Sequence, residues 1–349
     1  MSSDLIPAHR RDDVDRALRH AFGTTAVDDL AVLRGGLSPA LVYRAVLRGR
    51  PCLIRIETAL DGFRDPVRHH ACLAIAAEAG IAPPLLFADA DAGVVITDFI
   101  EARPLGAHPG GLAGIVREIA ALLARLQRTP VFPPLVDYLD GVDAVIADML
   151  ASGVLDQAAT APHFDAYRRI RDAYPRQAPA ALVSGHNDLN PGNILYDGRR
   201  LWLVDWESAF ANDPHADIAA AANFFGVEDG AEDALLGAVL GTTDDIGRAR
   251  LRLMRQVCNM FYAAMMLTLV AAARGPEARP IADLEAPALR EVRKGLGDGT
   301  VDVARPEGRL LYAKALLNEV KAEAESRAFI DAARRLAHGE GAGPATARR

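Results

Sequence analysis

The spacing of hydrophobic residues changes near residue 100, from short strand-like runs to helical periods. A leading helix is predicted over residues 11–22, where Val14, Leu18 and Phe22 recur at helical spacing and Gly23 ends the pattern. Short apolar runs separated by turn residues follow, and they are typical of β-strands. Five strands and one helix are predicted, the strands over 30–33, 41–47, 52–56, 85–88 and 94–99 and the helix over 67–79. Residues 1–100 are therefore expected to form a small lobe around an antiparallel sheet.

Residues 101–338 are expected to form a larger, mostly helical lobe, which makes the fold class α+β with two lobes. Helices are predicted over 111–128, 142–153, 162–173, 214–224, 230–240, 245–274 and 307–337. One β-hairpin interrupts them, because Asp197-Gly198 separates the apolar runs 194–196 and 201–206. The Gly- and Ala-rich residues 339–349 are predicted to be a disordered tail.

Composition narrows the class of protein and its compartment. The net charge of −7 argues against a nucleic-acid partner, which would require a basic surface. The three cysteines, Cys52, Cys72 and Cys258, have no metal-binding or redox spacing and are expected to be reduced core thiols of a cytoplasmic protein. No secretion signal is expected at the N-terminus. The longest apolar stretch, 257–273, falls short of the roughly 20 residues of a membrane span, so we expect a buried core helix there.

The strongest chemical signal is the segment from Ser184 to Asn193, immediately before the hairpin. It contains His186-x-Asp188 and, five residues after Asp188, Asn193, which is the spacing of a kinase catalytic loop. The hairpin then leads to Asp205. Phosphoryl transfer needs a base for the attacking hydroxyl and oxygen ligands for a divalent metal. We therefore assign Asp188 as the base, and Asn193 and Asp205 as ligands for Mg²⁺.

The residues around this motif are assigned supporting roles. His186 is expected to hold backbone groups rather than to titrate. Alternation along an extended chain would point Asp205 and Glu207 the same way, which makes Glu207 a supporting carboxylate. Asp188 has a competing interpretation as the acid of an Asx turn. The joint occurrence of the loop, the hairpin and Asp205-Trp206-Glu207 disfavours that interpretation.

The two segments 186–195 and 204–207 resemble the signature motifs of the aminoglycoside phosphotransferase/choline kinase superfamily. The continuation at 212–219 resembles its choline/ethanolamine kinase branch, where an acid corresponding to Asp217 braces the catalytic loop. The resemblance covers roughly residues 30–275. It implies a protein-kinase-like bilobal fold, MgATP as the phosphoryl donor and a small hydroxyl compound as the acceptor.

The same resemblance assigns residues to the nucleotide end. The turn carrying Gly35, Gly36 and Ser38 would cover the phosphates. Arg55 would bind them where protein kinases use lysine, since the first 293 residues contain no lysine. The hinge 97–101, with Asp98 and Ile100, would pair its backbone with adenine.

An acid on the helix after Arg55 would normally hold that cation, but His69 aligns with its position. Asp65 and Glu78 are the alternative partners. If His69 is the partner, its protonation near pH 6.5 would repel Arg55 and weaken nucleotide binding.

Three functions remain open at this point. A choline, ethanolamine or related amino-alcohol kinase ranks first and would need an aromatic cage. Its candidate residues are Trp206, Phe210, Phe224, Phe225, Phe261 and Tyr262. A kinase for aminoglycosides or other amino sugars ranks second and would need acids in the helical lobe. These acids would come from Asp213, Glu228, Asp229, Glu232 and Asp233. A nucleotide-binding pseudokinase scaffold is the alternative outside the enzyme class.

Overall fold

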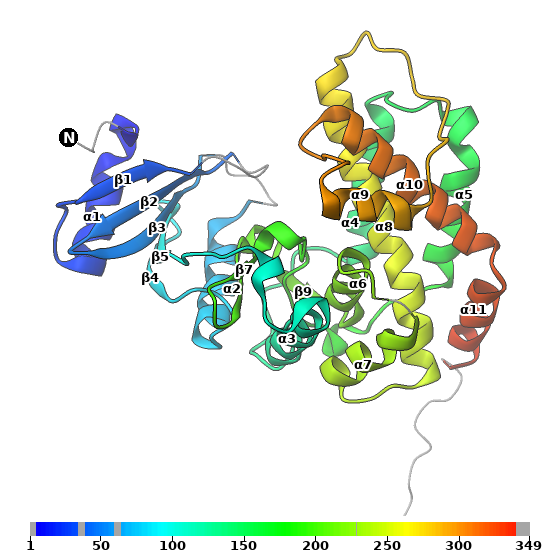
Figure 1. Cartoon of the computed structure of the whole chain (residues 1–349), viewed down its shortest axis with the longest axis horizontal. Helices are drawn as coiled ribbons and strands as arrows, with labels where there is room; N and C mark the ends of the chain where they lie inside the picture. The colour runs from blue at the N-terminus through cyan, green and yellow to red at the C-terminus, as the bar shows by residue number, and fades with distance from the viewer. Residues whose placement is uncertain (1–4, 34–38, 59–63, 228, 340–349) are drawn as a thin grey trace, which may run out of the picture. The chain divides into compact units, whose positions relative to one another are not determined.

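The computed structural model describes residues 5–33, 39–58, 64–227 and 229–339 (Figure 1). The chain divides into two compact units. The first comprises residues up to Leu135 together with Val183–Asn212, and the second comprises Val136–Leu182 and the chain from Asp213 onward. Helix α3 (Gly111–Leu126) and residues 183–212, which carry the predicted catalytic residues and are called the catalytic segment below, thus belong to the first unit, so these units do not coincide with lobes divided at residue 100.

A five-stranded antiparallel sheet, ordered β1-β2-β3-β5-β4, confirms the predicted strands. Its strands are β1 (Asp29–Val32), β2 (Leu41–Leu47), β3 (Arg50–Ile56), β4 (Leu85–Asp89) and β5 (Val94–Asp98). Side chains alternate across β3, so Cys52, Ile54 and Ile56 are fully buried on one face. Arg55 lies on the opposite face of this strand.

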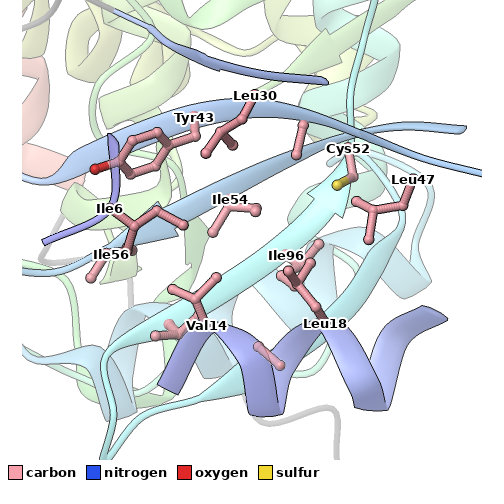
Figure 2. Close-up of a cluster of buried hydrophobic side chains, with 13 residues drawn as sticks. Ile6, Val14, Leu18, Leu30, Tyr43, Leu47, Cys52, Ile54, Ile56 and Ile96 are labelled. Atoms are coloured by element: carbon pink, nitrogen blue, oxygen red, sulfur yellow. The ribbon is translucent and has the colours of Figure 1, made fainter. Parts of the chain in front are cut away.

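Helix α1 (Arg11–Phe22) covers the apolar face of the sheet, as Figure 2 shows. Val14 and Leu18 are each 1% exposed and belong to one core cluster with Ile54, Ile56 and Ile96. Burying a side chain of this size stabilises the fold by about 1.5–3 kcal/mol. The packing fixes β3, and with it the position from which Arg55 projects.

Helix α2 (Pro66–Glu78) begins at an N-cap aspartate. The Asp65 side chain accepts a hydrogen bond from the Val67 N–H at 2.9 Å, and Pro66 occupies the first helical position. The Asp65 side chain is therefore used to cap the N-terminus of α2.

The catalytic segment contains two pairs of three-residue strands. β6 (Val183–Gly185) pairs with β9 (Phe210–Asn212), and β7 (Ile194–Tyr196) pairs with β8 (Leu201–Leu203) to form the predicted hairpin. The hairpin is shorter than predicted, because β8 ends at Leu203 and a 3₁₀ turn, η6 (Trp206–Ser208), follows. The β6–β9 pair was not predicted.

The second unit is helical. Its helices are α4 (Tyr138–Ala151), α5 (Gln157–Ala173), α6 (His215–Phe224), α7 (Asp229–Leu240), α8 (Asp245–Arg274), α9 (Leu289–Asp298), α10 (Pro306–Glu325) and α11 (Arg327–Gly339). The predicted single helix over 307–337 is wrong, because the chain leaves helical geometry at Ser326 between α10 and α11. Helix α9 was not predicted. The tail residues 340–349 lie outside the described residues.

Helix α8 is the core helix of the second unit and contacts α4, α5, α6, α7, α10 and α11. It is long and apolar enough to cross a membrane by length and composition, a test that buried core helices also pass. Half of its most apolar stretch is buried inside the unit, which agrees with the predicted core role.

The three cysteines are free and buried. Burial raises the pKa of the Cys52 thiol to about 11. Burial likewise raises the pKa values of the Cys72 and Cys258 thiols to about 12. All three are therefore protonated at neutral pH.

Candidate active site

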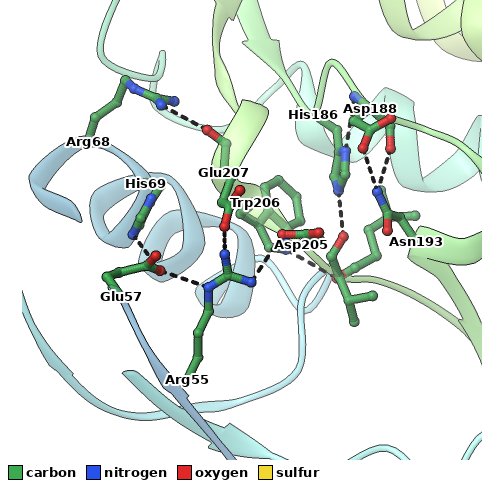
Figure 3. Close-up of polar contacts among 12 residues, drawn as sticks. Arg55, Glu57, Arg68, His69, His186, Asp188, Asn193, Asp205, Trp206 and Glu207 are labelled. Atoms are coloured by element: carbon green, nitrogen blue, oxygen red, sulfur yellow. Dashed lines mark hydrogen bonds and ion pairs between the residues drawn. The ribbon is translucent and has the colours of Figure 1, made fainter. Parts of the chain in front are cut away.

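Asp188 lies in the loop between β6 and β7 and has a fixed carboxylate (Figure 3). Its Oδ1 accepts a hydrogen bond from Asn190 Nδ2 at 3.0 Å, and its Oδ2 accepts one from Asn193 Nδ2 at 2.9 Å. The Asn190 side chain also accepts from the Gly192 N–H at 2.9 Å, so Asn190 is the residue that caps the following turn. The carboxylate of Asp188 thus remains oriented and partly exposed.

His186 is fully buried beneath this loop. Its Nδ1 accepts from the Asp188 N–H at 3.4 Å, so its Nε2 carries the hydrogen that is donated to the Val204 carbonyl at 3.0 Å. Its ring also contacts Trp206, with 4.6 Å between ring centroids. These contacts tie the catalytic loop to the end of β8 through backbone groups.

Asn187 is a residue of this site that the sequence did not reveal. Its backbone is left-handed, with φ +64°, a conformation that few residues other than glycine adopt but that asparagine tolerates. Its Nδ2 donates to the Ser208 carbonyl at 3.0 Å, and its Oδ1 accepts from Asn212 Nδ2 at 2.7 Å. Asn187 therefore fastens the start of the catalytic loop to η6 and β9.

Asp205 has the same left-handed backbone, with φ +64° and ψ +75°. The predicted alternation of Asp205 and Glu207 along an extended strand is therefore wrong, because the chain turns at Asp205. The two carboxylates still converge, since Asp205 Oδ1 lies 3.3 Å from Arg55 and Glu207 Oε1 forms an ion pair with the same guanidinium. The left-handed turn at Asp205, rather than the alternation of side chains along a strand, brings the two carboxylates together.

Asn193 and Asp205 are brought together by the hairpin. Val204, the residue directly before Asp205, donates its N–H to the Asn193 carbonyl at 3.0 Å. Because the Asn193 Nδ2 is held by Asp188, its Oδ1 points away from that carboxylate.

One amide oxygen and one carboxylate suit Mg²⁺, which keeps several waters and takes its remaining ligands from substrate phosphates. Among the residues that the structure describes, no cluster of three or more His, Cys, Asp or Glu side chains forms a self-contained metal cage. The donors present therefore fit a metal that arrives with a nucleotide.

Arg55 is surrounded by three carboxylates (Figure 3). Glu57 Oε1 lies 2.8 Å from its Nε, and Asp205 and Glu207 contact its two terminal nitrogens. The sequence candidates are not its partners: Asp65 caps α2, and Glu78 is exposed at the far end of that helix. Glu57 was missed, although it directly follows β3 and its separation of two residues from Arg55 along an extended chain places both side chains on one side.

His69 is not the partner of Arg55, although it aligns with the position of the helix acid. Its Nε2 lies 3.5 Å from Glu57 rather than against Arg55. Burial, the neighbouring His70 and the arginines Arg55 and Arg68 lower the pKa of His69 to about 3. The expected titration of His69 near pH 6.5 is therefore wrong, and the imidazole is uncharged at neutral pH.

The remaining predicted nucleotide residues are only partly placed. Gly35, Gly36 and Ser38 lie outside the described residues. In the hinge, the Asp98 N–H donates to the Pro84 carbonyl at 2.9 Å, and the Asp98 side chain pairs with Arg50. The Ile100 N–H has no hydrogen bond to any residue in the described ranges, and its pairing with adenine stays a prediction.

Asp217 lies in the first turn of α6, in the second unit, and is 3% exposed. Its bracing of the catalytic loop stays a prediction.

Solved structures with the same fold include kinases of two substrate classes. A choline/ethanolamine kinase family protein from Mesorhizobium loti matches with a TM-score of 0.61 and 21% identity, over 95% of this chain and 100% of that one. The choline kinase LicA from Streptococcus pneumoniae matches with a TM-score of 0.55 and 16% identity, over 77% and 93% of the two chains. A spectinomycin phosphotransferase, solved with ADP and spectinomycin, matches with a TM-score of 0.53 and 13% identity, over 87% and 98%.

At these identities the likeness shows the fold, and it confirms the predicted kinase-like α+β architecture. No curated protein is a significant match to the sequence. The model of the phosphotransferase enzyme family matches residues 29–254, which is well over half of the chain and includes the whole catalytic segment. The chain belongs to the phosphotransferase enzyme family.

Proposed function

We propose that the protein transfers the γ-phosphoryl group of ATP to a hydroxyl group of a small amino alcohol of the choline or ethanolamine type. The observation that carries this proposal is the oriented Asp188 carboxylate beside Asn193, with Asp205 joined to Asn193 by the hairpin and to Arg55 by an ion pair. These are the parts that phosphoryl transfer requires: a base, oxygen ligands for a metal and a cation for the phosphates.

Each residue has a distinct task in the proposed reaction. The oxygen of the acceptor hydroxyl bonds to the γ-phosphorus, and ADP leaves. The Asp188 carboxylate accepts the proton that this hydroxyl loses. Asn190 and Asn193 hold that carboxylate in place. Asp205 and Asn193 would hold Mg²⁺, which when bound neutralises charge on the phosphates. The N–H groups of the Arg55 guanidinium would donate charge-assisted hydrogen bonds to phosphate oxygens.

Three of the aromatic residues predicted for a cage lie together within the second unit. Phe224 on α6 and Phe261 on α8 both meet Tyr262 edge to face, with centroid separations of 4.8 and 5.2 Å. All three are partly exposed. Such a group attracts an ammonium ion through the electron-rich ring faces. Trp206, Phe210 and Phe225 are buried and are core residues rather than cage residues.

The acids proposed for an amino-sugar acceptor are mostly neutralised within the protein. Asp213 is buried and bonded to Tyr174 and His215. Glu232 forms an ion pair with Arg255, and Asp233 forms one with Arg248. The side chains of Glu228 and Asp229 lie outside the described residues. An aminoglycoside kinase is therefore the second choice, supported by the fold shared with a spectinomycin phosphotransferase.

We also place the protein in the cytoplasm. Its three cysteines are free and buried, which suits a reducing compartment.

The proposal is tested by measuring ADP release from ATP and MgCl₂ with choline, ethanolamine, spectinomycin, hygromycin B and simple sugars as separate acceptors. Turnover that depends on an amino alcohol and is lost in Asp188→Asn supports the proposal. Turnover with an aminoglycoside alone moves the protein to the second choice. ATP binding without turnover on any acceptor would instead identify a pseudokinase.

A further inference from the structure

Glu57 is a buried carboxylate with no role in the reaction described above. It follows β3 directly, its side chain is 3% exposed, and its Oε1 accepts a hydrogen bond from Arg55 Nε at 2.8 Å. A buried carboxylate is costly unless it is paired. Glu57 and Arg55 therefore stabilise each other's charge inside the first unit.

The three acids around Arg55 are not equivalent. Asp205 and Glu207 lie on the turn beside the proposed metal ligands and contact the terminal nitrogens of the guanidinium. Glu57 instead contacts Nε, at the inner edge of the guanidinium plane. Phosphate oxygens would compete for the terminal nitrogens, because these are the ones that face the turn. The Glu57 contact to Nε would therefore remain when phosphate binds the terminal nitrogens.

The backbone of Glu57 is held on both sides. Its N–H donates to the Gly93 carbonyl at 2.8 Å, and its own carbonyl accepts from Arg10 at 2.7 Å. Gly93 has φ +58°, and a Cβ at that position would lie 3.1 Å from the Glu57 Cβ. The chain is therefore closely packed where Glu57 leaves the strand, which gives its carboxylate a rigid base.

Helix α2 uses its side chains for other contacts. His69 lies 3.5 Å from Glu57 but is uncharged at neutral pH, so it cannot act as an acid for Arg55. Arg68 donates to the Glu207 carbonyl at 2.8 Å and to the Ala209 carbonyl. Helix α2 thus supports the turn that carries Asp205 and does not hold the Arg55 guanidinium.

We propose that Glu57 is the positioning residue that orients Arg55 for nucleotide phosphate, in place of a carboxylate on the helix. This inference rests on the proposed phosphotransferase function. It makes the orientation of the phosphate-binding cation a property of β3 and the residue that follows it, whereas in protein kinases the corresponding cation depends on an acid of a separate helix.

The test measures the affinity of the full-length protein for MgADP by calorimetry in Glu57→Gln, Arg55→Gln and the double variant. Glu78→Gln is the matched control, since Glu78 is exposed at the end of α2. Loss of one charge-assisted bond should weaken binding roughly 10- to 100-fold in Glu57→Gln. The double variant should bind no more weakly than Arg55→Gln, because Glu57 acts only through Arg55. KM for ATP should rise more than kcat falls.

The outcomes separate the two levels of the proposal. Normal binding by Arg55→Gln would remove Arg55 from the proposed nucleotide site. Weak binding by Arg55→Gln together with normal binding by Glu57→Gln would overturn the role of Glu57 alone, as would additive losses in the double variant. If Glu57→Gln fails to fold because the Arg55 Nε loses its buried acceptor, the double variant removes that donor as well. Its affinity relative to Arg55→Gln then decides the question: equal affinity supports the role, and weaker binding refutes it.

Discussion

Lowering the pH from 8 to about 5 should destabilise the first unit, because two buried imidazoles on α2 resist protonation. His69 and His70 are 5% and 6% exposed, and their ring centroids lie 4.7 Å apart. Burial is the main cause that lowers the pKa of His69 to about 3. Burial and Arg55 lower the pKa of His70 to about 4, against a weaker opposing effect of Asp89 and Asp65.

The sign follows from comparing the folded and unfolded chains. Above the ordinary histidine pKa of 6.5, both states hold these imidazoles uncharged, and the full stability is present. As the pH falls, the unfolded chain binds protons that the folded chain cannot accept, so stability is lost progressively from pH 6.5 down to the folded pKa values. One pKa unit corresponds to about 1.4 kcal/mol, so each histidine costs about 2 kcal/mol at pH 5 and the pair about 4 kcal/mol. This is a large part of a typical stability of about 5–15 kcal/mol.

The assay can be confined to the first unit because both tryptophans, Trp202 and Trp206, lie in it. Urea unfolding followed by tryptophan fluorescence is measured at pH 8 and pH 5 for the wild type and for His69→Gln/His70→Gln. The variant should lose about 4 kcal/mol less on acidification, since the acidic groups common to both proteins cancel in the comparison. His9→Gln, at an exposed position, should behave like the wild type. Equal losses in the wild type and the double variant would refute the reasoning.

Three further predictions concern the catalytic segment. Asp188→Asn should lose nearly all turnover but bind MgADP as the wild type does, because the amide keeps the shape but cannot accept a proton; normal turnover would exclude Asp188 as the base. Asp205→Ala should abolish Mg²⁺-dependent turnover and Asn193→Ala should reduce it less, because a neutral ligand contributes less to holding a dication; the reverse order at saturating Mg²⁺ would contradict the ligand assignment. Asn187→Gly should lower the free energy of unfolding by about 1–3 kcal/mol through lost hydrogen bonds, and Asn187→Ala should lower it further because alanine is strained at positive φ. Equal urea midpoints for the two Asn187 variants would contradict this prediction, because they would show that the backbone at residue 187 relaxes away from positive φ.

The sequence predicted the regular parts of the fold because their patterns are local. The bounds of α1 and β2 agree with the predicted ranges, since helical spacing and a terminal glycine define the former, and turn residues bracket the latter. The long helix over 307–337 was wrong because Ser326 breaks a pattern that remains apolar and periodic on both sides. The strands β6 and β9 are three residues each, too short to show alternation.

The candidate catalytic residues were predicted from their spacing, whereas the residues that support them depend on tertiary geometry. The distance from Asp188 to Asn193 along the chain is a local property, and the structure joins their side chains at 2.9 Å. The partner of Arg55 could not be identified from a resemblance that places the acid on the helix, because Glu57 directly follows β3, two residues from Arg55 along the chain. The left-handed turn at Asp205 has no sequence signal, since aspartate adopts that backbone only when its surroundings require it.

The buried thiols give this protein native chemical reporters of local opening. Cys52 lies in β3, Cys72 on α2 with its Sγ 3.4 Å from the Ala209 carbonyl, and Cys258 on α8 in the second unit. With thiol pKa values raised to about 11 or 12, none should react with an alkylating reagent until its surroundings open. Pulsed alkylation with peptide mass spectrometry would therefore measure the opening rates of three regions separately: the sheet, the contact between α2 and the turn, and the helical core. No labelling site has to be engineered into the chain.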